Sequence, residues 1–245
     1  AKPVPHIILT IDAGGTTVRF RLERDGSLLH DDWSIPASPD GHPPAFLSGL
    51  PQPDVVIAGI TKVSRPGVVD AWKRALELHF PVAQHVIVPD FELAAAASLD
   101  RPGAVMLLAG TGSLACLFDG NTVLRVGGRG WEYGDEGSGA FITTEAVRRC
   151  VRALDGMLPT TPLLNRIADV AETTDAGVFA AWARSKADLD GRGFLLPLIS
   201  EAAADGDRDA RNLLQGAGGW LARLARTAHQ KIASNTDIIH VRAVG

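Results

Sequence analysis

Residues 10–20 read TIDAGGTTVRF, and this stretch decides the fold of the first half of the chain. A strand-like run over residues 6–11 ends at Asp12, a turn with two glycines and two threonines follows, and alternation resumes at Val18. Glycines between two alternating runs are typical of a β-hairpin. A plain hairpin needs neither the carboxylate before the turn nor the hydroxyls after it, so the turn is a candidate binding site.

The same order of features returns at residues 104–120, AVMLLAGTGSLACLFDG. An apolar run is followed by the turn Gly110–Ser113, a second strand-like run and an Asp-Gly turn, as in the first copy. We interpret this as a weak internal duplication whose halves meet near residue 103. Two such turns facing each other across a cleft would offer backbone N–H groups and hydroxyls to an anion. Two unrelated hairpins in a β-rich fold remain the alternative.

Composition excludes several classes of partner. The 245 residues are 46% hydrophobic, enough for a sizeable core, and 24 basic and 28 acidic residues are well mixed along the chain. Without a basic block, we expect no nucleic-acid or membrane partner. No apolar run approaches the ~20 residues of a membrane span, and the N-terminus has no signal-peptide core. Cys116 and Cys150 form no CxxC motif, so we expect a reduced, cytoplasmic protein.

Periodicity predicts an α/β fold with a mixed sheet, because strand and helix patterns alternate. We expect strands at 6–11, 17–23, 27–33, 54–60, 85–89, 104–109, 114–118 and 237–244. Expected helices cover 67–80, 91–99, 139–155, 162–171, 175–186, 194–204 and 207–233, and residues 35–53 read as a loop around a short helix. Gly216, Gly218 and Gly219 inside the last helix indicate close packing in the first place, or a backbone approached by a ligand.

The chain lacks the P-loop and dinucleotide-binding glycine motifs at their required places, so phosphate recognition falls to the two hairpin turns. Asp12 at a strand end is then well placed to hold Mg²⁺, which favours one or two carboxylates plus phosphate oxygens. Thr16 and Ser113 would hydrogen-bond phosphate oxygens. The alternative for Asp12 is that it only shapes the turn.

Asp90 lies between an expected strand and the helix FELAAAAS, where it is also a good N-cap. Both roles are compatible, since ligands of open α/β sheets bind at the carboxyl ends of strands. The segment GGRGWEYGDEGSG, residues 127–139, is the richest in glycine. There, Asp135 can accept hydrogen bonds from sugar hydroxyls, Trp131 can offer a flat wall or serve as core, and Asp135 or Ser138 is expected to cap the next helix.

Together DAGGTT, VPDFELAAA, AGTGS and GGRGWEYGDEGSG resemble the N-acetylglucosamine kinase-like group of the BadF/BadG/BcrA/BcrD ATPase family, within the actin/hexokinase/Hsp70 superfamily. The resemblance implies two RNase-H-like (actin-like ATPase) lobes with an interlobe cleft that binds MgATP and a sugar. The N-terminal lobe would cover residues 1–103. The C-terminal lobe, with a helical insertion, would cover 104–245 and stop short of the family's usual end.

The resemblance also implies a role for each matching residue. Asp12 falls on the metal-associated acidic position and Asp90 on the general base for the sugar hydroxyl. The phosphate turns would be Gly14, Gly15, Thr16 and Thr17, and Gly110, Thr111, Gly112 and Ser113. Sugar contacts would come from Asp90, Ser113, Gly128, Gly130, Trp131, Gly134, Asp135 and Glu136.

Several positions depart from the family pattern. Ala13 and Thr17 replace a glycine and a lysine-like residue of the first turn, which removes one expected phosphate contact. Pro89 replaces an asparagine before Asp90, and the loop ASPDGHPP offers Ser38 or Asp40 where the family has a sugar-binding asparagine.

From these residues we expect an ATP-dependent sugar kinase acting on an amino sugar such as N-acetylglucosamine or glucosamine, at the 6-hydroxyl, with ATP and Mg²⁺. A homodimer is suggested by the resemblance alone. Two alternatives stay open. One is an ATPase that activates a partner enzyme, which in this family uses cysteines to hold an iron–sulfur cluster; the other is a non-catalytic sugar sensor on a kinase scaffold.

Overall fold

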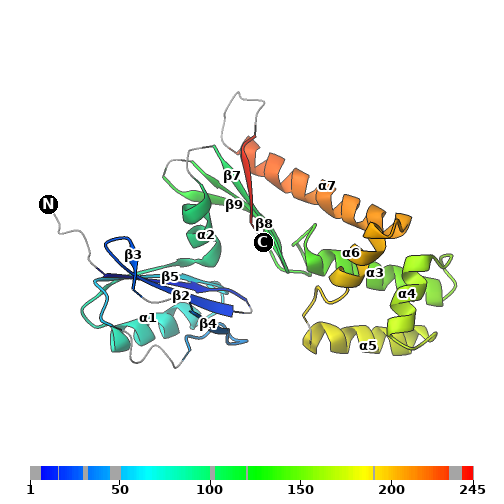
Figure 1. The fold of residues 1–245 in the computed structure, drawn as a ribbon, viewed down its shortest axis with the longest axis horizontal. Coiled ribbons are helices and arrows are strands. Elements are labelled where there is room, and N and C mark those ends of the chain that lie inside the picture. Colours follow the sequence, from blue (N-terminus) through cyan, green and yellow to red (C-terminus); the bar gives the residue numbers. More distant parts are fainter. Residues whose placement is uncertain are drawn as a thin grey trace. The chain divides into compact units, whose positions relative to one another are not determined.

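The computed structural model describes residues 7–15, 17–29, 33–44, 51–99, 103–119, 121–189, 191–231 and 239–244. Its contacts divide the chain into two units, Ala1–Ser98 and Leu99–Gly245, each with its own mixed β-sheet (Figure 1). The predicted α/β class with two sheet-based lobes is therefore confirmed. The domain boundary at residue 103 stays a prediction.

Unit 1 combines an antiparallel meander with parallel strands. Its described strands are β1 (Ile7–Ala13), β2 (Thr17–Arg24), β3 (Ser27–Leu28), β4 (Trp33–Pro36), β5 (Val55–Ile60) and β6 (Gln84–Pro89). They lie in the order β3-β2-β1-β5-β6, and β4 also pairs with β2. β1 is antiparallel to β2 and parallel to β5, which in turn is parallel to β6. The meander predicted at the N-terminus is thus present.

Side chains alternate between the two faces of the unit 1 sheet, and each face packs against a different helix. These helices are α1 (Val68–His79) and α2 (Asp90–Ser98). One face packs against α1 through buried side chains that include Leu9, Ile11, Phe20, Val56 and Trp72. The other face meets α2, since a Cβ added to Gly59 would lie 2.7 Å from the side chain of Leu93. The helices thus cover opposite faces (Figure 1).

The single strand expected at 27–33 is wrong. Two short strands, β3 and β4, pair with opposite ends of β2 because the antiparallel register brings Leu28 to Glu23 and Pro36 to Thr17. No helix or strand covers residues 37–44. The short helix expected within 35–53 otherwise falls partly on residues 45–50, which lie outside the described residues.

Unit 2 has the sheet order β10-β7-β8-β9, formed by β7 (Val105–Ala109), β8 (Ser113–Phe118), β9 (Val123–Gly127) and β10 (Val241–Val244). β9 was not expected from the sequence. β7 has an antiparallel partner on one side, β8, and a parallel partner on the other, β10. This is the arrangement of β1 between β2 and β5, so the topology agrees with the internal duplication.

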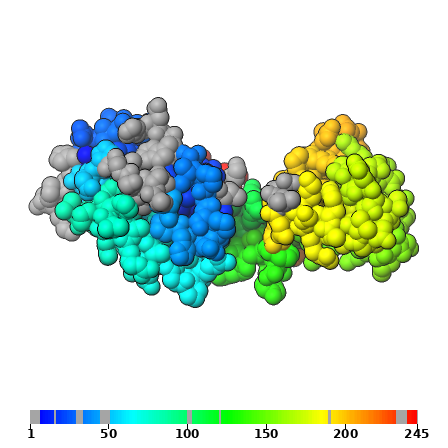
Figure 2. Space-filling view, turned by 90° about the horizontal axis from the view of Figure 1, so that it is seen from below, coloured from blue at the N-terminus to red at the C-terminus, as the bar shows by residue number. Residues whose placement is uncertain are grey.

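The helices of unit 2 are α3 (Gly139–Leu154), α4 (Pro162–Val170), α5 (Ala176–Leu189), α6 (Leu196–Ala204) and α7 (Arg208–Gln230). Helix α7 belongs to two cores. Its first half packs Ala210, Leu213 and Ala217 with α3 to α6, and its second half packs Leu224 and Ala228 on the sheet (Figure 1). In space-filling view α4 to α6 form one continuous surface (Figure 2). No described helix is long and apolar enough to cross a membrane.

The close packing expected at Gly216, Gly218 and Gly219 is wrong. A Cβ added at any of the three would meet no atom within 4 Å, because these positions lie on the exposed side of α7. The buried side of the same helix turns is occupied by Ala217.

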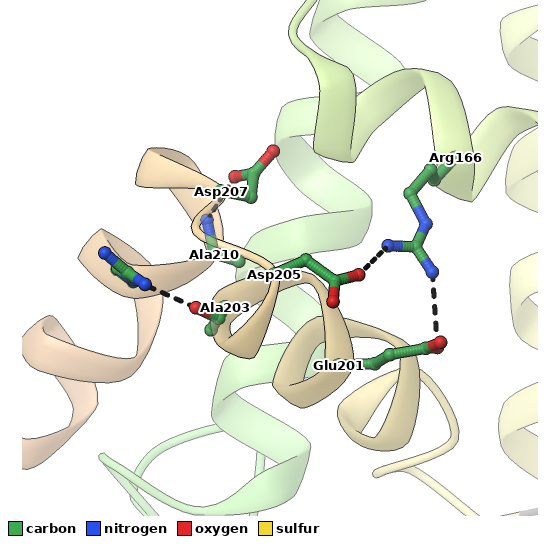
Figure 3. A network of polar contacts seen from close by, with 7 residues as sticks. Arg166, Glu201, Ala203, Asp205, Asp207 and Ala210 are labelled. Atoms are coloured by element: carbon green, nitrogen blue, oxygen red, sulfur yellow. Dashed lines mark hydrogen bonds and ion pairs between the residues drawn. The ribbon is translucent and has the colours of Figure 1, made fainter.

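Side-chain caps set the starts of four described helices in unit 2, among them α5, where Asp175 Oδ1 accepts the Val178 N–H at 2.8 Å. Ser138 Oγ accepts the Phe141 N–H at 3.1 Å, which confirms the cap expected for α3, and Thr161 caps α4. At α7, Asp207 Oδ1 accepts the Ala210 N–H at 2.9 Å (Figure 3). Beside this cap, Arg166 of α4 forms ion pairs of 3.2 and 3.3 Å with Glu201 and Asp205.

We expect the Asp207 cap to contribute more to the free energy of unfolding than the ion pairs of Arg166 do. Asp207→Ala should cost about 1 kcal/mol of unfolding free energy, because an amide of α7 loses its acceptor. Arg166→Ala should cost less than about 1 kcal/mol, since its partners are both 66% exposed. Urea unfolding followed by circular dichroism measures both; a larger loss for Arg166→Ala than for Asp207→Ala would contradict this ranking.

Candidate functional site

The first turn is the short connection between the end of β1 and the start of β2. The Gly14 N–H donates to the Thr17 carbonyl at 3.0 Å, and Gly15 is exposed. Thr16, predicted to contact phosphate, lies outside the described residues. The turn therefore presents glycine backbone directly beside the end of β1.

Asp12 lies at this strand end, on the α2 side of the sheet, because its neighbours Ile11 and Ala13 are buried on the α1 side. The antiparallel register sets Asp12 opposite Arg19, and Arg19 Nη1 lies 3.3 Å from Asp12 Oδ2. The carboxylate is 41% exposed. Asp12 is thus an accessible acid whose described ion-pair partner is a surface arginine.

Asp90 is brought to the same edge of the sheet by parallel pairing. Ala13, Ile60 and Pro89 stand in one row across β1, β5 and β6, so all three strands end together. Asp90 follows Pro89 directly, two strand spacings or about 10 Å from β1. Gly59, which lies in the row of Asp12 and has no side chain, leaves room on this face for Leu93 of α2. The two predicted acids therefore share one carboxyl edge.

Asp90 opens α2 as its first helical residue rather than as a separate N-cap. Its Oδ1 accepts the N–H of Phe91, the next residue, at 2.9 Å. A carboxylate in a first helical turn also interacts favourably with the helix dipole. This arrangement fixes the carboxyl group where β6 meets α2.

The loop over residues 37–42 reaches the same edge, since β4 ends at Pro36 beside Thr17. Three side chains that follow β5 hold it. Lys62 Nζ donates to the Pro39 carbonyl at 2.5 Å, the buried Trp72 Nε1 donates to Gly41 at 2.9 Å, and Arg65 pairs with Asp40 at 3.2 Å. Lys62 itself has a φ of 57°. The sequence analysis missed these anchors, because no pattern marks residues that meet only in the fold.

The second turn, in unit 2, is held from behind by the start of α3. Gly110 N–H closes the turn on Gly112 at 2.9 Å, while Gly139 and Ala140 donate N–H groups to the carbonyls of Gly110 and Thr111. Thr111 is exposed. These bonds leave the outer surface of the turn accessible and fix its backbone.

Ser113 joins this turn to the glycine-rich segment. The residue is 2% exposed, and its Oγ donates to the Glu136 carbonyl at 2.7 Å. Its described role is thus to position residues 135–138 against the turn. The structure therefore brings together the two segments of unit 2 that the sequence analysis singled out.

Close approaches to backbone atoms require glycine at two positions of the segment. Gly137 has a φ of 85°, and a Cβ there would lie 2.6 Å from the Ala217 carbonyl of α7. A Cβ at Gly134 would lie 2.9 Å from the backbone nitrogen of Arg129. The remaining predicted sugar-contacting glycines, Gly128 and Gly130, also have positive φ.

Asp135 is pinned at the second turn. It has a φ of 57°, and a Cβ added to Gly112 would lie 3.1 Å from its Oδ2. Burial raises the pKa of the Asp135 carboxyl above its ordinary value, while hydrogen bonds from the backbone N–H groups of Ser113 and Gly130 act in the opposite direction. The carboxyl group is thus a constrained acceptor.

Trp131 lies on the same segment and is 42% exposed, so it is not a core residue. The Arg192 guanidinium lies 3.9 Å from the centroid of its ring, within range of a cation–π contact. This contact restrains the indole.

The described residues include no group of three or more His, Cys, Asp and Glu side chains that could hold a metal ion by themselves. A single accessible carboxylate such as Asp12 fits Mg²⁺ that arrives with phosphate oxygens as further ligands. Both cysteines are buried, and burial raises the pKa of the Cys150 thiol to about 11.

The chain is similar to known proteins that are named as sugar kinases. The chain is 29% identical over 237 residues to the glucosamine kinase GspK of Vibrio cholerae, covering 90% of this chain and 80% of that protein. A candidate N-acetylglucosamine kinase from Chromobacterium violaceum has a similar fold, with a TM-score of 0.74 and 24% identity over 99% of this chain and 88% of its own. A second such candidate, from Porphyromonas gingivalis, has a TM-score of 0.68 and 20% identity over 92% and 83% of the two chains.

The model of one family, described as the BadF/BadG/BcrA/BcrD ATPase family, matches residues 54–245. This range contains Asp90, the second turn and the glycine-rich segment, and it covers most of the chain. The chain belongs to the BadF/BadG/BcrA/BcrD ATPase family.

Proposed function

We propose that the protein is an ATP-dependent kinase that phosphorylates an amino sugar, glucosamine or N-acetylglucosamine, at the 6-hydroxyl. The observation that carries the proposal is the position of Asp90 at the same carboxyl edge as Asp12 and the first glycine turn. Membership of an ATPase family and the similarity to a protein named a glucosamine kinase support it. A cytoplasmic location and a homodimer form part of the same proposal.

In this mechanism Asp90 accepts the proton of the sugar hydroxyl as the hydroxyl oxygen attacks the terminal phosphorus of ATP, and the bond from this phosphorus to the bridging oxygen breaks to release ADP. Kinases rely chiefly on positioning and charge neutralisation, so the base must be fixed rather than strongly basic. The start of α2 and the Phe91 N–H fix Asp90 in this way.

The phosphates would be bound by the backbone of the two turns, Gly14–Thr17 and Gly110–Ser113. Asp12 would hold Mg²⁺, and charge neutralisation on the phosphate oxygens is the chemistry that this ion supplies when bound. Ser113 would act mainly through position, because its hydroxyl already holds the Glu136 carbonyl.

The sugar would be bound by Asp135 and the segment around it. Asp135 would accept hydrogen bonds from sugar hydroxyls, and Trp131, with Gly128, Gly130, Gly134 and Glu136, would form the adjoining wall. Ser38 or Asp40 would add a polar contact from the loop over residues 37–42, which Lys62 and Arg65 hold at the edge of unit 1.

Asp90→Asn tests the proposal. Because the amide cannot accept the proton, turnover should fall by about 10²–10⁴-fold, while the affinity for the sugar changes little. Coupled ADP release measures turnover and calorimetry measures sugar binding. Glu92→Gln, two residues further along α2, is the matched control and should keep wild-type turnover. If Asp90→Asn works at a near-normal rate, Asp90 has no part in the mechanism.

At neutral pH, we expect Asp135→Asn to raise the stability of the protein and to lower its affinity for the sugar. The native pKa of Asp135 is raised above the unfolded value, so the protonated form favours folding. That contribution is complete below the unfolded pKa of about 3.9 and is lost as the pH rises through the native pKa. At neutral pH the asparagine variant should therefore be more stable than wild type, and asparagine also tolerates the positive φ.

This stability difference should shrink as the pH is lowered, because Asp135 takes up its proton in the native state before it does so in the unfolded state, and it should be gone below the unfolded pKa of about 3.9. Sugar affinity should fall at neutral pH, since a charged acceptor is lost. Urea midpoints across this pH range and calorimetry with glucosamine and N-acetylglucosamine measure the two effects. A variant less stable than wild type at neutral pH would show that the hydrogen bonds to the carboxylate outweigh its burial.

The partner-activating ATPase is less well supported. Its iron–sulfur cluster would need accessible thiolates, whereas Cys116 lies buried in β8 and Cys150 buried in α3, with its Sγ donating to the Leu164 carbonyl at 3.7 Å.

A further inference from the structure

The Trp131 ring, which the proposed function uses as a wall for the sugar, has little support from its own turn. That turn is closed by the Tyr133 N–H, which donates to the Gly130 carbonyl at 3.3 Å. Glu132 and Tyr133, the next two residues, are exposed, and the indole itself is 42% exposed. Exposed side chains exchange rotamers freely unless a neighbour restrains them. The restraint on this ring therefore has to come from another part of the chain.

Arg192 supplies such a restraint from the connection between α5 and α6. Its guanidinium lies over the indole, 3.9 Å from the ring centroid. Among the described residues, no carboxylate forms an ion pair with Arg192, so the aromatic ring rather than an acid accounts for its placement. A guanidinium is attracted to the negative face of an indole and stacks flat on it. One face of Trp131 is thus covered, and the opposite face is left for a ligand.

The backbone that carries Arg192 is itself fixed. The Phe194 N–H donates to the Gly191 carbonyl at 3.2 Å and closes a turn around Arg192. A Cβ added to Gly193 would lie 3.7 Å from the carbonyl carbon of Gly139, so the turn packs on the start of α3. The same end of α3 donates N–H groups to the second glycine turn. The guanidinium is therefore held at a defined place relative to the glycine-rich segment.

We propose that Arg192 is a positioning residue for the sugar: it stacks on one face of Trp131 and so holds the opposite face ready for the apolar C–H groups of the sugar ring. This inference rests on the proposed function, in which Trp131 is part of the sugar site. Arg192 acts through the indole and touches no reacting atom. A ring that is already oriented loses less conformational freedom when the sugar binds, which raises affinity.

Calorimetry without nucleotide tests the inference on the full-length protein, with N-acetylglucosamine and glucosamine as the probes. Arg192→Gln keeps part of the stem but removes the charge. It should weaken sugar binding by about 2–30-fold, the range that a cation–π contact is worth. Arg192→Lys retains a cation and should recover part of the loss. The matched control is Arg223→Gln, which removes a similar contact with Trp220 on α7, 4.6 Å from the ring centroid, and should bind sugar like wild type.

Steady-state kinetics separate positioning from catalysis. In Arg192→Gln the KM for the sugar should rise while kcat and the KM for ATP change little, because only binding of the sugar loses support. A fall in kcat with an unchanged KM for the sugar would contradict a positioning role.

A double-mutant cycle shows whether Arg192 acts through the ring. In a Trp131→Ala background, Arg192→Gln should cause no further loss of sugar affinity. A further loss as large as that in the wild-type background would mean that Arg192 acts on the sugar by another route, and the inference would be overturned. The emission of Trp131, taken as the difference between the wild-type and Trp131→Phe proteins, should also lose anisotropy in Arg192→Gln, because the ring then moves more freely.

The outcomes for the two proposals are distinguishable. Unchanged or tighter sugar binding by Arg192→Gln overturns the inference and leaves the proposed kinase intact, because Asp90 is tested separately. If the wild-type protein binds a sugar but does not phosphorylate it, the kinase is overturned, and the same affinities still decide the role of Arg192. If it binds neither sugar, both proposals are overturned. Melting temperatures of the Arg192 variants should stay close to that of wild type, so that a loss of binding is not a folding defect.

Discussion

The parallel pairing of β1, β5 and β6 is the constraint on which the rest of unit 1 depends. Because the three strands are in register up to Ala13, Ile60 and Pro89, whatever follows them lies along one edge. Asp12 and Asp90 are far apart in sequence but lie along this one edge, separated by about two strand spacings. Gly59 allows α2 to pack closely on this face, since any larger residue would collide with Leu93. A slip of one residue in β1 would turn Asp12 into the core.

In unit 2, the polar groups are positioned by the packing of the glycine-rich segment rather than by strand register. The glycine-rich segment is pressed between the second turn and α7, and Ser113 and Ser138 fix its far end to the turn and to α3. Asp135 is then held in a strained backbone conformation beside Gly112. Backbone strain of this kind persists only where surrounding packing over-determines it, and it concentrates at functional sites. Here the packing of α7 on both cores of the unit supplies that support.

The sequence predicted the features that depend on residues close together in the chain. Alternation around AGGTT and GTGS revealed both hairpins, and Ser138 was recognisable as a cap from its place before a helix. The predictions failed where neighbours come from elsewhere in the chain. The glycines of α7 face open space, which their sequence cannot show, and the splitting of the strand at 27–33 follows from its register on β2. Likewise, the ion pair of Arg19 and the anchoring of residues 37–42 by Lys62 depend on pairings visible only in the fold.

The central claim is that a fixed strand-end carboxylate and glycine turns together transfer phosphate from ATP to an amino sugar. The most direct measurement is ADP release by the full-length protein across glucosamine, N-acetylglucosamine and plain hexoses, with the product analysed for a 6-phosphate. The account predicts release that depends on an amino sugar and yields one sugar 6-phosphate per ADP. Release that is independent of every sugar, or no release at all with bound sugar, would contradict it and favour the partner-activating ATPase or the sensor, respectively.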